Sequence, residues 1–215
     1  MPVELVPHQS LIALGRLAGS RGYLWGTSGN MSVRRSESHF LITMRGTALD
    51  QLDTQDFVLA PLHGEPGEPP EASTEIQLHR RIYQARPDVR CVIHLSPFYS
   101  TLVACTDLAL PTDLVPETAL YLGEVVRVPY VQPGTDELAR AVAEALGKER
   151  WVALMANHGV VAVGQSPPDT FRRIEVLEFL CRLMVTARGA GLELQRIGAE
   201  AVAALRRHYA VKARW

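Results

Sequence analysis

The chain has 215 residues, of which 47% are hydrophobic and 21% are charged, and its formal net charge is −1. This length can bury a sizeable core in one domain or in two small ones, and the composition is that of an ordinary globular protein. Because there is no basic excess to neutralise phosphates, nucleic acid is not an expected partner. No apolar run reaches the roughly 18 residues of a membrane-spanning helix, so no membrane contact is expected.

The termini and the cysteines indicate a cytoplasmic protein. Residues 1–7 contain Glu4 and place no basic residue before an apolar stretch, so they are not typical of a signal peptide. The three cysteines, Cys91, Cys105 and Cys181, are widely spaced in apolar surroundings. We expect them to be buried thiols in a reducing compartment, and not a disulfide framework or a zinc cluster.

In the first half of the chain, the sequence predicts a helix followed by three short strands. Apolar residues at helical spacing cover residues 11–21, and Gly22 follows as a helix terminator. Alternating or β-branched segments then predict strands at residues 31–34, 39–43 and 57–60. Residues 61–70 hold glycine or proline at six of ten positions, which predicts a surface loop.

In the second half, strands and helices alternate. Ser73 or Thr74 is expected to cap a helix that contains Glu75 in its first turn and ends near residue 86. Strands are predicted at residues 89–95, 125–131, 151–156 and 160–164, and helices at 97–105, 135–146, 170–188 and 199–209. This order predicts one α/β domain with a mixed sheet.

Two polar segments are candidates for binding an anion. The loop Gly26-Thr27-Ser28-Gly29-Asn30 combines tight backbone geometry with hydroxyl and amide donors. Ser73 and Thr74 would add the free N–H groups of a helix start. The alternative for each segment is structural: a polar turn for the first, and plain helix capping for the second.

Three residues could form a metal site. His94 ends an apolar strand, and His158 lies in a turn between two apolar strands. Either histidine alone is more typical of a structural residue, but together with Glu75 they form a His2Glu set, which zinc accepts with a fourth position open. Ser96 stands two residues after His94, where another imidazole would complete the set. His79 is expected to be a buried structural histidine.

The motifs, taken in order, resemble the class II (zinc-dependent) aldolase/adducin family, and the size and layout resemble its bacterial L-fuculose-1-phosphate aldolases. The resemblance covers nearly the whole chain. It is carried by the segments at residues 27–34, 42–46, 73–79, 82–89 leading into His94, 133–135 and 157–160.

The resemblance implies a fold, an assembly and a site. The fold would be a single-domain α/β/α layered fold over residues 1–215, with a central mixed, largely antiparallel sheet flanked by helices. The assembly would be a homotetramer in which residues 199–215 reach a neighbouring subunit. The metal would be Zn²⁺ or another divalent ion held by His94 and His158, with Glu75 as the catalytic acid/base or a third ligand, and Tyr209 as a second catalytic group. A phosphate pocket would be formed by Thr27, Asn30, Gly46, Ser73 and Thr74.

The chain departs from the family pattern at three positions. Ser96 replaces the second histidine of the family's His-x-His motif, which removes one zinc ligand. Arg45 stands where the sugar-phosphate aldolases have a small hydroxyl residue, so it could strengthen anion binding, select a carboxylate or project into solvent. Val115 lies near the position of another family tyrosine. Glu117, nearby, is an unassigned carboxylate that could act across a subunit boundary or lie exposed.

The leading functional expectation is a metal-dependent lyase that cleaves a carbon–carbon bond in a small sugar phosphate or related ketose. Relatives on the same scaffold act as decarboxylases, 4-epimerases or dehydratases, so these reactions remain alternatives. A metal-poor, non-catalytic binding module like the adducin head is the alternative from another class.

Overall fold

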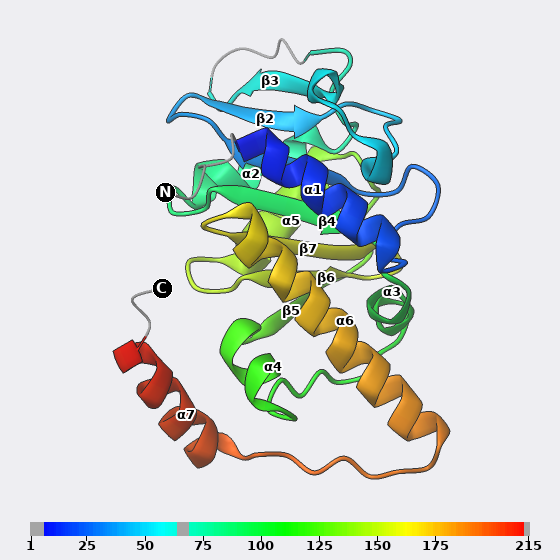
Figure 1. Cartoon of the computed structure of the whole chain (residues 1–215), viewed down its shortest axis with the longest axis vertical. Coiled ribbons are helices and arrows are strands. Elements are labelled where there is room, and N and C mark those ends of the chain that lie inside the picture. The colour runs from blue at the N-terminus through cyan, green and yellow to red at the C-terminus, as the bar shows by residue number, and fades with distance from the viewer. Residues whose placement is uncertain (1–6, 64–68, 213–215) are drawn as a thin grey trace.

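Seven strands form one mixed sheet in the computed structural model, which describes residues 7–63 and 69–212 (Figure 1). The strand order is β3-β2-β1-β4-β7-β6-β5, and only the β5–β6 pair is parallel. The largely antiparallel mixed sheet confirms the predicted fold class. The strands are β1 (Asn30–Arg34), β2 (His39–Thr43), β3 (Phe57–Pro61), β4 (Cys91–Leu95), β5 (Val125–Val128), β6 (Val152–Met155) and β7 (Gly159–Gly164).

Helices cover both faces of this sheet. One face carries α1 (Pro7–Ser20), α3 (Phe98–Ala104) and α6 (Pro167–Gly189), while α2 (Ile76–Ala85) and α5 (Asp136–Leu146) cover the other (Figure 1). Beyond the β5 edge lie the short α4 (Pro116–Tyr121) and α7 (Ala199–Lys212). Two 3-10 turns, Leu49–Gln51 and Thr54–Asp56, complete the elements. No helix in the described part of the chain combines the length and apolarity needed to cross a membrane.

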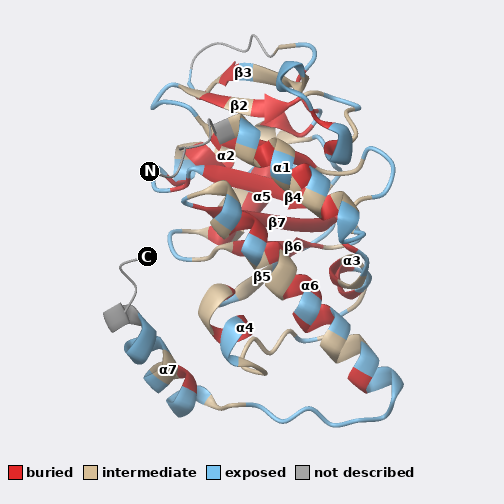
Figure 2. Cartoon of the chain, viewed as in Figure 1, coloured by how far each residue is buried: buried red, intermediate tan, exposed pale blue. Residues whose placement is uncertain are grey.

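The strand period of two divides the core into two halves. On β4, Cys91, Ile93 and Leu95 pack on the α1/α6 side, whereas Val92 packs on the α2/α5 side. All five residues of β4 are buried (Figure 2). The near-continuous apolar run therefore reflects a central strand covered on both faces, as predicted.

Several predicted boundaries need correction. α2 begins at Ile76, so Glu75 occupies the N-cap position instead of the first helical turn, and no side-chain cap forms there. Ser73 forms the preceding turn, with its carbonyl accepting from the amide of Ile76. The strands predicted at residues 89–95 and 125–131 are shorter, and α4 was not predicted because six residues carry too little periodicity. Residues 64–68 of the predicted loop lie outside the described residues.

The cysteine prediction is partly wrong. Cys91 and Cys181 are buried free thiols, but Cys105 is exposed. Cys105 follows the last residue of α3, where the chain leaves the core. Nothing in the local sequence distinguishes this helix end from a buried one.

A buried polar network joins α2 to β1. The hydroxyl of Ser32 lies 2.6 Å from Nδ1 of His79 and 2.8 Å from the hydroxyl of Tyr83, and Nε2 of His79 lies 2.5 Å from Oδ1 of Asn30. His79 and Tyr83 are fully buried among apolar residues. The network fixes the helix directly above the strand because each buried polar atom would otherwise lack a partner. His79 is the buried structural histidine that the sequence predicted.

The network predicts a specific loss of stability in acid. Burial lowers the pKa of His79 to about 3, whereas the unfolded chain protonates this residue near its ordinary value of about 6.5. Below about pH 6.5 the unfolded state therefore binds a proton that the folded state does not. The stabilisation that neutral His79 gives to the folded state is complete above this pH and declines toward pH 3 by about 1.4 kcal/mol per pH unit.

The measurement is urea unfolding in the presence of a chelator for the wild type and His79→Gln from pH 8 to pH 4. The difference in free energy of unfolding between the two proteins should shrink as the pH falls. In the matched variant His39→Gln, this free energy should depend on pH as it does in the wild type. A parallel pair of curves for the wild type and His79→Gln would contradict the assignment.

Candidate metal centre and cavity

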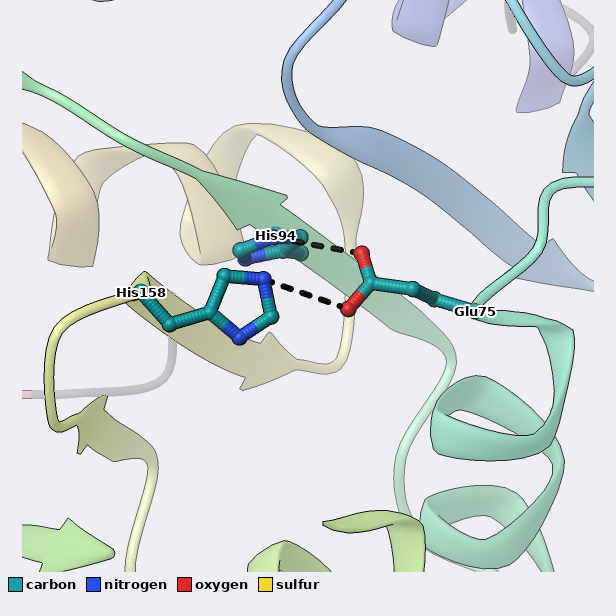
Figure 3. A group of neighbouring side chains, drawn as sticks. All are labelled: Glu75, His94 and His158. Carbon is teal, nitrogen blue, oxygen red and sulfur yellow. Dashed lines mark ion pairs between the residues drawn. The ribbon is translucent and has the colours of Figure 1, made fainter. Parts of the chain in front are cut away.

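Three side chains from separate elements meet at one point (Figure 3). Glu75 precedes α2, His94 lies on β4, and His158 lies in the turn between β6 and β7. Oε2 of Glu75 lies 3.3 Å from Nε2 of His94, and Oε1 lies 3.3 Å from Nε2 of His158. One ligand atom from each residue lies within 4.8 Å of the others. The three groups form a possible divalent-metal site of the predicted composition.

Sheet pairing and two glycines bring the parts together. β4 pairs with β1 on one side and β7 on the other, which places Asn30 and Val161 opposite His94. A Cβ on Gly29 would lie 2.7 Å from the carbonyl oxygen of His94, and one on Gly159 would lie 2.7 Å from that of Leu95. Both loops can therefore approach β4 only because glycine lacks a side chain.

The protonation pattern of His94 calls for a cation between the imidazole and Glu75. Nδ1 of His94 lies 2.9 Å from the carbonyl oxygen of Val160. Since a carbonyl only accepts, Nδ1 carries a proton, so Nε2 is the ring atom that faces the carboxylate. Nε2 and the carboxylate oxygen attract each other at this distance only when a proton or a metal ion lies between them. The carbonyl of Val160 thus occupies Nδ1 and leaves Nε2 available to a metal ion.

One further atom supports the same conclusion. Among the residues that the structure describes, the buried Oε1 of Glu75 has no hydrogen-bond partner. Unsatisfied buried polar atoms are costly and are typical of sites completed by a ligand or an ion. The residues present therefore fit a divalent cation.

Electrostatics keep Glu75 ionised. Burial alone would raise the pKa of Glu75, but His94, His158 and the amide of Asn30 outweigh it, so this pKa lies below its usual value. Burial and the neighbouring His94 lower the pKa of His158. Metal binding needs the ionised carboxylate of Glu75 and imidazoles without a proton on Nε2, so a bound cation would take the place of that proton.

The three groups open into a cavity of about 700 Å³. Its wall includes every predicted phosphate-binding residue, namely Thr27, Asn30, Arg45, Gly46, Ser73 and Thr74. It also includes residues that we did not predict, chiefly Trp25, Met44, Thr47, Gly134 and Asn157. The aromatic residue directly before the Gly26 loop is a signal that could have identified Trp25, which is 64% exposed. Gly134 and Asn157 lie in the segments 133–135 and 157–160 that carry the family resemblance, which was a signal for them, whereas Thr47 gave none.

Arg45 and Ser96 take defined positions in this cavity. Arg45 is exposed at its rim and donates to the carbonyl of Pro70. Ser96 is 4% exposed, and its hydroxyl donates to the carbonyl of His158 at 3.3 Å. Ser96 therefore supports the turn that carries His158.

Three other residues of interest lie away from the cavity. Tyr209 lies on α7 and is 43% exposed, and α7 contacts α4 beyond the far edge of the sheet (Figure 1). Glu117 is exposed in the first turn of α4, and Val115 immediately precedes that helix. None of the three is part of the cavity wall within this chain.

Comparisons with known proteins identify the family of this chain. Residues 9–185 match the Class II Aldolase and Adducin N-terminal domain family. The 3-oxo-tetronate 4-phosphate decarboxylase of Haemophilus influenzae is 30% identical over 191 residues, which is 86% of this chain and 90% of that protein. The L-fuculose phosphate aldolase of Methanococcus maripaludis is 30% identical over 174 residues, covering 80% of this chain and 92% of that one.

Comparison with solved structures finds a protein of similar fold. The crystal structure of YgbL from Klebsiella pneumoniae superimposes with a TM-score of 0.84 and 30% identity, over 93% of this chain and 97% of that one. The two curated relatives carry the names of lyases, which confirms the expectation of a lyase-type enzyme. The chain therefore belongs to the class II aldolase and adducin family.

Proposed function

We propose that this protein is a metal-dependent carbon–carbon lyase whose substrate is a small phosphorylated sugar acid or ketose, with decarboxylation of a 3-oxo acid as the favoured reaction. The observation that carries the proposal is the carboxylate of Glu75, which faces Nε2 of both His94 and His158 at the base of a polar cavity. The named relatives act on phosphorylated substrates, which supports the substrate class.

His94 and His158 would hold the cation through Nε2, and Glu75 would hold it through Oε1, the oxygen without a hydrogen bond among the described residues. A divalent cation in this position would supply Lewis-acid polarisation of a substrate carbonyl. Zn²⁺ accepts this His2Glu set with a fourth position left open for substrate. Oε2 of Glu75 accepts a hydrogen bond from Asn30 at 2.8 Å, which orients the carboxylate toward the two rings.

The polar wall of the cavity would bind the phosphate. Thr27 and Gly46 come from two loops, and Ser73 and Thr74 lie just before α2 on the same cavity. Hydroxyl and backbone donors in such turns are suited to phosphate oxygens. Arg45 would add positive charge at the rim. Binding energy from the phosphate would then orient the reacting carbons beside Glu75.

The histidine missing at Ser96 favours decarboxylation over aldol cleavage. When a 3-oxo acid releases CO2, the electrons of the broken bond pass to the neighbouring carbonyl oxygen, and no base must first remove a proton. Aldol cleavage begins with removal of a hydroxyl proton by a base. If Glu75 serves as the third ligand, it is a poorer base, and the reaction that needs none is the better match. The decarboxylase name of the Haemophilus relative supports the same choice.

A tetramer and a catalytic role for Tyr209 stay predictions. Tyr209 lies outside the cavity of its own chain, so any role in catalysis requires that α7 reach the cavity of a neighbouring subunit. The exposed side chain of Tyr209 is compatible with such a contact.

The first prediction concerns metal content. The purified protein should bind about one divalent ion per chain, because two buried ligands and the half-buried His158 converge on one point. His94→Ala and His158→Ala should each abolish binding, as measured by elemental analysis after zinc loading and dialysis. The matched variant His39→Ala, which changes a histidine outside the site, should bind as the wild type does. Wild-type protein that stays metal-free in excess zinc would refute the site.

A second prediction concerns Ser96. An imidazole at this position adds a ligand, so Ser96→His should tighten zinc binding, measured by competition with a chelator. The control is Ser96→Ala, which removes only the bond to the carbonyl of His158 and should not tighten it. If Ser96→His binds zinc more weakly than the wild type in a folded protein, position 96 does not face the ion.

A third prediction concerns the reaction. The zinc-loaded enzyme should release CO2 from 3-oxo-tetronate 4-phosphate faster than it forms aldehyde from a ketose 1-phosphate. Both products are measured by coupled assays. Thr74→Ala should lower kcat as well as raise KM, because phosphate binding that orients the reacting carbons also contributes to turnover. Faster aldehyde release would reverse the preferred reaction, and turnover on neither substrate would reject the proposal.

A further inference from the structure

A line of hydrogen bonds runs from the metal centre into the core on the α2 side of the sheet. It begins at Oε2 of Glu75, 2.8 Å from Nδ2 of Asn30, and continues from Oδ1 of Asn30 to Nε2 of His79 at 2.5 Å. From there it passes through Nδ1 of His79 to Ser32 and ends at Tyr83. Ser32, His79 and Tyr83 are each 1% exposed or less, so solvent cannot substitute for any partner.

The chemistry of each group fixes the direction of every bond. Glu75 is ionised and only accepts, so the Asn30 amide donates from Nδ2, and its Oδ1 must accept from Nε2–H of His79. A neutral imidazole with hydrogen on Nε2 has a bare Nδ1, which accepts from the hydroxyl of Ser32. The oxygen of Ser32 then accepts from the hydroxyl of Tyr83. All four bonds therefore donate toward Glu75, and no alternative assignment satisfies them all.

We propose that His79 is a positioning residue, which locks the Asn30 amide in one orientation and thereby fixes the Glu75 carboxylate for the metal and the substrate. The line is not a proton relay, because the carboxamide of Asn30 does not readily pass a proton from one end to the other. Its contribution is geometric. Without the donor on Nε2, Oδ1 of Asn30 loses its partner, and the bond to Glu75 alone holds the amide in place.

Sequence spacing makes the arrangement possible. Asn30 and Ser32 lie two residues apart on β1, so both face α2, while Met31 between them packs on the opposite side. His79 and Tyr83 lie four residues apart on α2 and present their polar atoms to the same strand face. Two ordinary periodicities thus align four polar groups behind one carboxylate.

The test compares three variants of the full chain. His79→Leu removes both ring nitrogens. His79→Gln keeps one N–H donor and one acceptor. Tyr83→Phe removes the hydroxyl at the far end and serves as the matched control, since it leaves the bonds of His79 to Asn30 and Ser32 in place. The measurements are zinc affinity by chelator competition, thermal unfolding, and the tautomer of His79 by nitrogen-15 NMR of the metal-free protein.

We expect His79→Leu to weaken zinc binding by about 10–100-fold, the usual effect of losing a residue that supports a metal ligand. His79→Gln should recover most of this loss, and Tyr83→Phe should bind zinc as the wild type does even if it unfolds at a lower temperature. Zinc affinity that is unchanged in His79→Leu, or reduced equally in Tyr83→Phe, would show that His79 only stabilises the core and would overturn the proposal.

The effect on zinc affinity rests on the proposed metal site, but the tautomer does not. If the wild type binds no zinc, the proposed function fails, and the NMR spectrum alone then decides the inference. Hydrogen on Nε2 of His79 supports the line of bonds, and hydrogen on Nδ1 overturns it.

Discussion

The structure around the site depends on one constraint: the buried carboxylate of Glu75 faces two imidazoles. Placing a charge in a low-dielectric interior is costly unless opposite charge or hydrogen bonds compensate it. The Asn30 amide supplies one bond, and the carbonyl of Val160 holds the ring of His94 so that Nε2 faces the carboxylate. A divalent cation satisfies all of these groups together. The rest of the fold can be understood as the support that keeps them in place.

That support comes from the centre of the sheet, not from its edges. β4 is flanked by β1 and β7, so His94 lies between the strand that carries Asn30 and the strand that follows His158. Hydrophobic residues fill both faces of the strand. Because closely packed cores resist displacement, His94 is held more rigidly than a loop residue would be. The anion-binding part of the cavity, by contrast, consists of loops and helix starts, which vary readily among proteins that share a scaffold.

Ser96 links the chemistry of this protein to its departure from the family pattern. Its hydroxyl supports the His158 turn instead of supplying a metal ligand. In the proposed site Glu75 would serve as a ligand, which would reduce the ability of this residue to remove protons. One substitution just after β4 would then change which carbon–carbon cleavage the same fold favours, without altering the architecture. Family membership alone does not settle the reaction, because function depends on the site.

The sequence by itself determined the order and type of most elements, since the apolar periodicity of strands such as β4 and of helices such as α5 is strong. It also singled out Glu75, His94 and His158 as a candidate ligand set and named six residues of the cavity wall, but not Trp25, Met44 or Thr47. It did not reveal α4, because the six residues of this helix carry little periodic signal. It also did not reveal the exposure of Cys105. Only the tertiary structure decided that Asn30, Ser32, His79 and Tyr83 form one line behind Glu75. These residues belong to two elements separated by more than forty positions, and their contact follows from strand pairing and helix packing that local patterns do not encode.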